Sequence, residues 1–164
     1  METRQDKINY YLNIAESVLE RSTCNRRLFG AVIVKNDEIV STGYNGSPRG
    51  RRNCNDKGFC LREKLGVVRG QRYELCCAVH AEANAIISAS RYDMIGSSLF
   101  LVGKEKSSME YTKDISCCSM CKRLVINAGI KEVYCRTSDN EWKYIDVEKD
   151  WVNDWCDEFD INGY

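Results

Sequence analysis

The sequence predicts an α/β protein, a three-layer α/β/α sandwich whose helices pack on both faces of one mixed sheet. Three observations support this prediction. Apolar residues recur at three- and four-residue intervals through residues 6–22, which is typical of a helix. Two β-rich runs then flank Asn36-Asp37, and helical and strand patterns alternate along the rest of the chain. The expected order of elements is α-β-β-α-β-α-β-α.

The first elements follow from local patterns. The helix over 6–22 buries a stripe made of Ile8, Tyr11, Leu12, Ala15, Val18 and Leu19. The run FGAVIVKNDEIVSTGYN predicts a hairpin that turns at Asn36-Asp37. Residues 45–75 are irregular and basic, and a loop of this length inside a compact domain needs a function or an anchor.

The later elements are shorter. We expect helices at about 80–91 and 119–127, the second ended by Gly129, strands at 98–102 and 131–136, and a polar loop at 103–116. The tail from Asn140 onward is acidic, and it predicts a final amphipathic helix that contains Trp151, Val152, Trp155, Cys156 and Phe159. Because no repeat or linker interrupts the pattern, residues 1–164 are expected to form a single domain.

Charge and hydropathy restrict the function. Lys+Arg and Asp+Glu both count 24, so the formal net charge is zero, which disfavours a protein that binds nucleic acid with its whole surface. The charged start METRQDKINYY lacks the apolar core of a signal peptide, and no later apolar run is long enough to span a bilayer. We therefore expect a soluble, cytoplasmic protein with no membrane partner.

The chain has ten cysteines and one histidine, His80. Disulfides are disfavoured in a reducing compartment, which leaves metal binding, redox chemistry or burial as roles for the thiols. His80-Ala81-Glu82 opens one predicted helix, and Cys118-Ser119-Met120-Cys121 opens another. Cysteines at positions i and i+3 of a helix start point the same way.

One imidazole and two thiolates are three protein ligands, which leave the fourth position of a tetrahedral zinc open, as in catalytic sites. The N-termini of both helices add partial positive charge, which favours the thiolate form of Cys118 and Cys121. Water on such an ion loses a proton near neutral pH, and Glu82 is placed to take it as a general acid/base.

These motifs resemble the H-x-E…P-C-x-x-C signature of the zinc nucleobase deaminases. Within that superfamily the chain is similar to deoxycytidylate (dCMP) deaminases, through CNRRLFGAVIVKNDEIVSTGYNGSPRG, CLREKL, RYELC, VHAEANAI and CSMCKRLVINAGI. The resemblance implies a cytidine deaminase-like fold. It also implies a zinc-dependent hydrolase that converts dCMP to deoxyuridylate (dUMP) and ammonia, and that feeds thymidylate synthesis.

The resemblance also implies residue roles. His80, Cys118 and Cys121 would hold the catalytic zinc, and Glu82 would protonate N3 of cytosine and then the departing amine. Asn45 would contact the sugar, and the Ala81 backbone would lie near the pyrimidine. Some relatives hold a second, structural zinc, for which the ligands here would be Cys24, Cys54, Cys60 and Cys76, with Cys77 as the spare. The alternative is that some of these thiols are simply buried.

Regulation and assembly are implied in the same way. The segment made of Gly43, Tyr44, Asn45 and Gly46 would serve a nucleotide effector, dCTP as activator or dTTP as inhibitor, although its glycines are also typical of a tight turn. Relatives are oligomers, so a hexamer or a dimer is expected.

The sequence departs from the family in two informative places. Cys117 stands where most of the superfamily has proline, and it could compete as a metal ligand. No tyrosine follows the strand at 131–136 closely, as it often does in bacterial relatives, so Arg26 and Arg136 are the predicted phosphate contacts instead.

Two alternatives remain. The substrate could be another cytosine compound, such as dCTP or cytidine, whereas a tRNA adenosine deaminase is disfavoured by the zero net charge and the lack of aromatic-rich basic patches. The chain could also be a non-catalytic, zinc-stabilised nucleotide-binding module. Glu82 argues against the second alternative, because a structural zinc site needs no proton shuttle.

Overall fold

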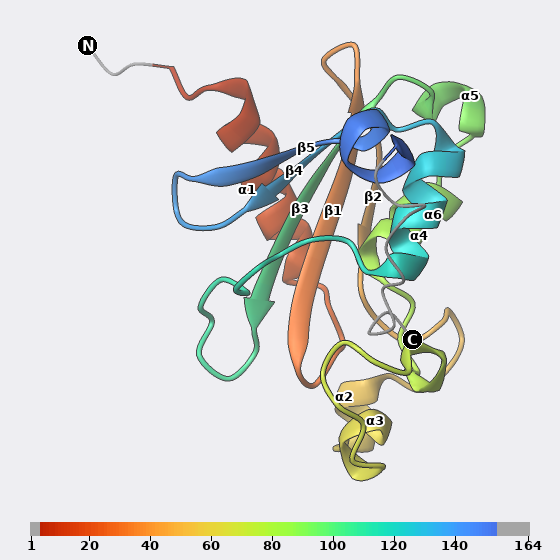
Figure 1. Cartoon of the computed structure of the whole chain (residues 1–164). Coiled ribbons are helices and arrows are strands. Elements are labelled where there is room, and N and C mark those ends of the chain that lie inside the picture. The colour runs from red at the N-terminus through yellow and green to blue at the C-terminus, as the bar shows by residue number, and fades with distance from the viewer. Residues whose placement is uncertain (1–3, 154–164) are drawn as a thin grey trace.

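The protein is described by a computed structural model over residues 4–153, and five strands form its one mixed sheet (Figure 1). Their order across the sheet is β2-β1-β3-β4-β5. β1 (Arg27–Lys35) pairs antiparallel with β2 (Glu38–Tyr44) and with β3 (Ser98–Glu105), and β3 runs parallel to β4 (Glu132–Arg136). β5 (Trp142–Asp146) closes the sheet antiparallel to β4.

Helices cover both faces of this sheet, so the three-layer prediction is confirmed. α1 (Lys7–Leu19) packs on one face, while α4 (Ala81–Ile87) and α6 (Ser119–Ala128) lie on the other (Figure 1). Successive residues of β1 serve the two layers in turn: Ala31 and Ile33 join the core beneath α4 and α6, and Val32 and Val34 join the core beneath α1. Alternation of this kind follows from the pleat of a strand.

α1 begins where the sequence places a cap. The Asp6 carboxylate accepts a hydrogen bond from the Asn9 backbone N–H at 2.9 Å, which satisfies one of the free donors of the first turn. The predicted stripe is buried at Tyr11, Leu12, Ala15 and Leu19. The helix lies so close to β1 that a Cβ at Gly30 would overlap the Ala15 carbonyl.

The predicted hairpin is also confirmed. Asn36 and Asp37 connect β1 to β2 with φ angles of 51° and 64°, the positive pair that a type I′ turn requires. The Asp37 carboxylate then accepts hydrogen bonds from Lys7 Nζ and Tyr11 Oη, both at 2.7 Å. The turn therefore fixes the position of α1 as well as the register of the strands.

The second helical layer depends on a glycine in β2. Gly43 is buried beneath α4, and a Cβ there would overlap the Ala81 carbonyl oxygen and the Ala85 amide nitrogen. Ser41, two residues earlier on the same face, donates to the Ala85 carbonyl at 2.7 Å. α4 therefore rests directly on the backbone of β2, which sets the depth at which its first residues lie.

Several boundaries differ from those expected. The helix predicted over 80–91 is two helices, because α4 ends at Ile87 and Ser90 caps a new one, α5 (Arg91–Met94), by accepting from the Asp93 N–H at 3.2 Å. The irregular stretch 45–75 contains α2 (Cys54–Lys57), α3 (Leu61–Lys64) and the 3₁₀ turn η1 (Tyr73–Leu75). β3 continues to Glu105, three residues beyond the prediction, because Arg27, Leu28 and Phe29 still pair with it.

The tail is the largest difference. β5 was not expected, since Ile145 is its only buried residue and its polar residues resemble those of a loop. A π-helical turn, η2 (Glu148–Asn153), follows it and buries Trp151. Trp155, Cys156 and Phe159 of the expected final helix lie outside the described residues. Among the residues that the structure describes, no helix has the length and apolar character that crossing a membrane requires.

We predict that Gly43→Ala separates α4 from β2 and lowers the free energy of unfolding by about 1–3 kcal/mol, as forced overpacking does. Urea unfolding followed by circular dichroism measures the effect. Thr42→Ala is the matched control, because Thr42 is the exposed neighbour on the same strand. Equal stability of the Gly43→Ala variant and the parent would contradict the close approach.

Candidate metal centre and active site

Three donors meet where α4 and α6 begin. The ligand atoms of His80, Cys118 and Cys121 all lie within 4.8 Å of one another, and Cys118 Sγ and Cys121 Sγ are each 3.4 Å from His80 Nδ1. His80 and Cys118 are the N-cap residues of α4 and α6, and both have an extended backbone. Cys121 lies in the first turn of α6, so the i, i+3 spacing brings its thiol beside that of Cys118.

The geometry of this group fits zinc. Tetrahedral Zn²⁺ with its usual bond lengths to sulfur and nitrogen would place these donors about 3.6 Å apart, close to the spacing found. A His-Cys-Cys set is also a typical donor set for this ion. Three protein donors leave one tetrahedral position for a water molecule or a substrate. Among residues 4–153, no other three donors come together in this way.

The hydrogen bonds within the group favour negative charge on one thiol and positive charge on the imidazole. A hydrogen bond with Cys121, and a further one with His80, lower the pKa of the Cys118 thiol to about 4 despite its burial. Burial alone would lower the pKa of His80, yet hydrogen bonds with Cys118 and Cys76 raise it to about 11. The hydrogen bond with Cys118 raises the pKa of Cys121 far above its usual range, so Cys121 keeps its proton until a cation replaces it.

Glu82 lies one step further into α4 and is only 5% exposed. Burial raises the pKa of its carboxyl group, and the positive charge on His80 lowers it in part. A buried carboxylate with a raised pKa, next to a metal-binding group, is suited to accept and return a proton.

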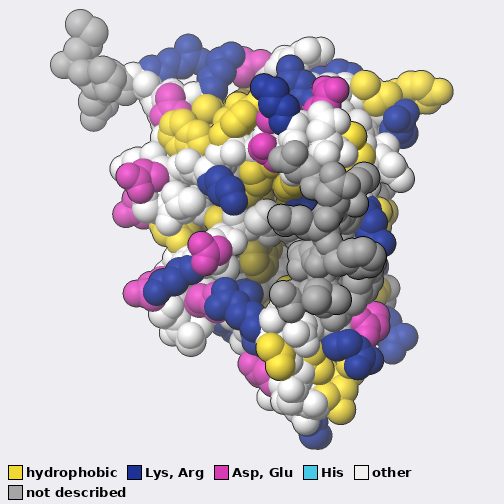
Figure 2. Space-filling view, in the orientation of Figure 1, with side chains coloured by type: hydrophobic (Ala, Val, Ile, Leu, Met, Phe, Trp, Pro, Cys, Tyr) yellow, Lys and Arg dark blue, Asp and Glu magenta, His cyan; other side chains and the backbone are white. Residues whose placement is uncertain are grey.

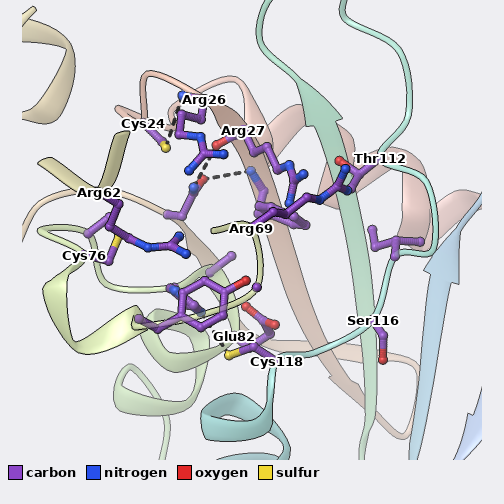
Figure 3. Close-up of a pocket in the computed structure, with 18 of the residues that line it drawn as sticks. Cys24, Arg26, Arg27, Arg62, Arg69, Cys76, Glu82, Thr112, Ser116 and Cys118 are labelled. Atoms are coloured by element: carbon purple, nitrogen blue, oxygen red, sulfur yellow. Dashed lines mark hydrogen bonds between the residues drawn. The ribbon is translucent and has the colours of Figure 1, made fainter. Parts of the chain in front are cut away.

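A cavity of about 490 Å³ opens over this group. Its lining includes His80, Ala81, Glu82 and Cys118. Figure 3 shows Glu82 and Cys118 close together on one side of it. The side chains of Arg26, Arg27 and Arg69 lie across the cavity from Glu82 and Cys118, and Arg62 and Lys113 add further positive charge to the wall. The cavity is therefore suited to an anionic molecule whose uncharged end reaches the metal-binding group.

Some of these cations already have partners. Arg26 pairs with Glu63 at 2.9 Å, and Arg27 pairs with Glu105 at 2.8 Å. The Arg62 guanidinium packs on the Tyr73 ring and donates to the Val68 and Gln71 carbonyls. Within residues 4–153, Arg69 and Lys113 form no ion pair or hydrogen bond. They are the cations most available to a ligand.

The neighbouring Thr112 is a further residue of the cavity wall that sequence reasoning missed. Its hydroxyl is buried and has no hydrogen-bond partner in the described part of the chain. Arg69, Thr112 and Lys113 all come from segments without periodicity, so no pattern in the sequence distinguishes them from solvated loop residues. The clustering of charge in residues 45–75 pointed toward Arg69 alone.

Asn45 and Ala81 line the cavity as predicted residues of the substrate site. Asn45 Oδ1 accepts hydrogen bonds from the Phe29 N–H at 2.8 Å and from the Ser22 hydroxyl, and Nδ2 donates to the Arg27 carbonyl at 2.9 Å. This amide therefore holds the ends of β1 and β2 together, and one N–H of Nδ2 is left for a ligand. Ala81 is fully buried in the first turn of α4.

The prediction that Arg136 contacts the substrate phosphate is wrong. Arg136 is 2% exposed and does not line the cavity. Its guanidinium donates to Asn13 Oδ1 at 2.8 Å and to the carbonyls of Asn9 and Asp139. The end of β4 lies beneath α1, so this arginine anchors that helix.

The four cysteines proposed for a second metal lie near one another. Cys24, Cys54, Cys60 and Cys76 line one cavity of about 30 Å³, together with Cys77. Burial raises the pKa of the Cys54 thiol, and a hydrogen bond with Ser47 at 3.6 Å opposes that rise. Their sulfur atoms do not reach the close spacing of the first group in the described residues.

The predicted effector segment is mostly buried. Gly43 lies under α4, and Gly46 pairs with Val79 through two backbone hydrogen bonds of 2.8 and 3.1 Å. Asn45 lines the cavity, and Tyr44, at 38% exposure, is the one residue of the 43–46 segment at the surface. The segment packs between the sheet and the residues that precede α4. Gly43 therefore has no exposed surface that an effector could contact.

Charges of both signs are interspersed on the surface. Figure 2 shows Lys and Arg side chains next to Asp and Glu side chains over the visible face, and no continuous basic area covers it. This distribution agrees with the zero net charge of the chain. It is unlike the basic stripe that nucleic-acid-binding domains present.

Comparison with known proteins gives a consistent result. A family described as the cytidine and deoxycytidylate deaminase zinc-binding region matches residues 5–137. The deoxycytidylate deaminase of Mycobacterium phage D29 is 35% identical over 136 residues, which cover 80% of this chain and 94% of the relative. The deoxycytidylate deaminase of Schizosaccharomyces pombe is 34% identical over 132 residues, but this chain spans only 37% of its length.

A solved structure agrees as well. The dCMP deaminase of the cyanophage S-TIM5, in complex with dCMP and dUMP, superposes with a TM-score of 0.56 at 27% identity. The match covers 82% of this chain and 84% of that chain.

Proposed function

The chain belongs to the cytidine and deoxycytidylate deaminase family, and we propose that it hydrolyses deoxycytidylate to deoxyuridylate and ammonia. The observation that carries this proposal is the clustering of His80, Cys118 and Cys121 beside a cavity. Glu82 and several arginines also line this cavity. The relatives named deoxycytidylate deaminase support the choice of substrate.

The reaction needs one water molecule and two proton transfers. Zn²⁺ held by His80, Cys118 and Cys121 would supply the Lewis acidity that makes a water molecule nucleophilic near neutral pH. Glu82 takes a proton from the water and gives it to N3 as the oxygen adds to C4. Glu82 then carries the second proton of the water to the amine, the C4–N4 bond breaks, and ammonia leaves. Burial favours this role, because it raises the pKa of Glu82 towards neutrality.

The cations across the cavity favour a phosphorylated substrate. Arg69 lines the cavity and has no partner within residues 4–153 (Figure 3). Arg26 also lines the cavity, although it pairs with Glu63. A guanidinium can bind phosphate through two parallel hydrogen bonds. We assign the 5′-phosphate to Arg26 and Arg69, and the sugar to the free N–H of Asn45. Cytidine, which has no phosphate, would not use these arginines.

We predict that Glu82→Gln lowers kcat at least about 100-fold, because the variant cannot move protons. The release of ammonia from deoxycytidylate measures the loss, and the zinc content of the same sample should stay that of the parent. Glu38→Gln, an exposed residue of β2 outside the cavity, is the matched control. Turnover by Glu82→Gln at the parent rate would refute the proposed mechanism.

We predict that Arg69→Ala raises KM for deoxycytidylate about 10- to 100-fold, since a charge-assisted hydrogen bond contributes about 1.5–3 kcal/mol. Turnover of deoxycytidine should be unchanged, because this nucleoside has no phosphate. Arg21→Ala, at an exposed position outside the cavity, serves as the control. An equal loss with both substrates would contradict the phosphate contact, and a parent that prefers dCTP or cytidine would change the assigned substrate.

We further propose a second, structural zinc, held by Cys24, Cys54, Cys60 and Cys76. Closure of these thiols around an ion would pin the segment that carries Arg62 and Arg69. The cavity that the four cysteines share supports the proposal. Their sulfur atoms would have to move closer together to bind one ion.

Elemental analysis tests both metal sites. We predict two zinc ions per chain in the parent protein, one in the Cys54→Ser/Cys60→Ser variant, and one in the Cys118→Ser/Cys121→Ser variant. Only the first of these variants should retain activity, with a lower thermal midpoint. A parent value of one zinc would remove the structural site.

Regulation and assembly complete the proposal. Activation by dCTP, inhibition by dTTP, a hexameric or dimeric state, a cytoplasmic location and a supply of deoxyuridylate to thymidylate synthesis are the properties that the family resemblance suggests. Assays of the parent with and without each triphosphate address the first two of these. Any effector contact near the 43–46 segment would involve the exposed Tyr44.

A further inference from the structure

Thr112 is a buried polar residue at the wall of the active-site cavity that the proposed reaction does not use. Its side chain is 5% exposed, and its hydroxyl forms no hydrogen bond within residues 4–153. Buried hydroxyls in folded proteins are nearly always hydrogen-bonded, because burial without a partner is costly. An unpaired hydroxyl at a cavity wall therefore points to a ligand that pairs with it.

The backbone at Thr112 is held by the sheet. The Thr112 N–H donates to the Gly103 carbonyl at 2.9 Å. The preceding Tyr111 forms a β-bridge with Lys104 of β3, and its hydroxyl donates to Glu16 Oε2 of α1 at 2.9 Å. Threonine is β-branched, so its χ1 angle has few accessible values. The hydroxyl is therefore positioned before any ligand binds, and little entropy is lost when it pairs with one.

Thr112 lies in the cationic part of the cavity. Figure 3 shows it on the same side as Arg27 and Arg69. Glu82 and Cys118 lie away from it in the same view. The end of a substrate that meets Thr112 is therefore not the end that meets the metal-binding group.

The residues next to Thr112 favour an anionic group at that end. Lys113 also lines the cavity, and neither Lys113 nor Arg69 forms an ion pair or a hydrogen bond within residues 4–153. Both of these side chains are exposed, so they can rearrange around a ligand while the backbone at Thr112 stays in place. Phosphate oxygens accept hydrogen bonds from hydroxyl groups as well as from arginine and lysine.

We propose that Thr112 is a specificity-determining residue, whose hydroxyl donates a hydrogen bond to the 5′-phosphate of the substrate. The inference rests on the proposed function, which places a nucleoside monophosphate in this cavity. It adds a neutral and prepositioned donor to the two arginines assigned to that phosphate. In the ligand-free protein the unpaired hydroxyl is unfavourable. Its removal should therefore weaken the binding of phosphorylated ligands without destabilising the ligand-free protein.

Kinetics of the zinc-loaded enzyme test the proposal. Thr112→Val removes the hydroxyl at nearly constant shape and should raise KM for deoxycytidylate about 10-fold or more, the size expected for one hydrogen bond to a charged group. Its kcat should stay within about 2-fold of the parent, and so should its KM for deoxycytidine, which has no phosphate. Thr112→Ser keeps the donor, so its KM for deoxycytidylate should stay within about 3-fold of the parent.

Thr42→Val, at an exposed position of β2 outside the cavity, is the matched control and should behave as the parent does. An unchanged KM for deoxycytidylate in Thr112→Val would overturn the proposal. An equal rise in KM for deoxycytidylate and deoxycytidine would also overturn it. An equal rise in Thr112→Val and Thr112→Ser would have the same consequence, because packing would then explain both.

Calorimetry supplies readouts that do not depend on turnover. Deoxyuridylate, the product, should bind Thr112→Val about 10-fold more weakly than it binds the parent, whereas the binding of deoxyuridine should be unchanged. Without ligand, the thermal midpoint of Thr112→Val should equal or exceed that of the parent, because an unpaired buried hydroxyl has been removed. A clearly lower midpoint would overturn the proposal, since the hydroxyl would then have a structural partner.

Failure of the proposed function gives a different result. A parent that deaminates no cytosine compound would overturn the deaminase reaction, while weaker binding of deoxyuridylate by Thr112→Val would still support the phosphate contact. Equal binding of deoxyuridylate by Thr112→Val and the parent would overturn the phosphate contact, even in an active deaminase.

Discussion

The close packing of α4 on β2 is the contact on which the candidate site depends. Gly43 has no side chain to hold the helix away, and Ser41 ties the same helix to the same strand. His80 and Glu82 belong to the first residues of that helix. Their depth beneath the surface is therefore set by the sheet and not by the loops around them.

α6 supplies the other two donors of the metal-binding group, and it also does so from its first residues. Cys118 and Cys121 occupy its cap and first turn, and Gly129 ends it with a φ of 80°. The parallel pairing of β3 and β4 requires a crossover, which α6 provides on the face that α4 also covers. Two helix starts thus meet over one end of the sheet, where their backbone dipoles favour negative charge on the thiols.

The sequence was sufficient for the elements that have a strong period and for the metal-binding group. α1, the β1–β2 hairpin and α6 have clear apolar patterns or caps, and the spacing of His80, Glu82, Cys118 and Cys121 indicates their shared chemistry. β5 was missed because a half-exposed edge strand has almost no apolar pattern. The role of Arg136 was predicted wrongly because residue type alone does not distinguish a buried arginine from one that binds a ligand. Only the contacts of the folded chain separate them, and the same is true of Arg69.

The wall formed by residues 54–78 differs in kind from the rest of the cavity. α2 and η1 bury no residue, and α3 buries only Arg62, whose contacts stay within the same segment. Other lining residues belong to β1 and α4, which pack against the core. Segments with few buried apolar groups open at a small fraction of the free energy of global unfolding. Without an ion on its cysteines, this wall is therefore expected to open locally while the sheet and α4 keep their geometry. Amide hydrogens along it would exchange with solvent far sooner than those of β1.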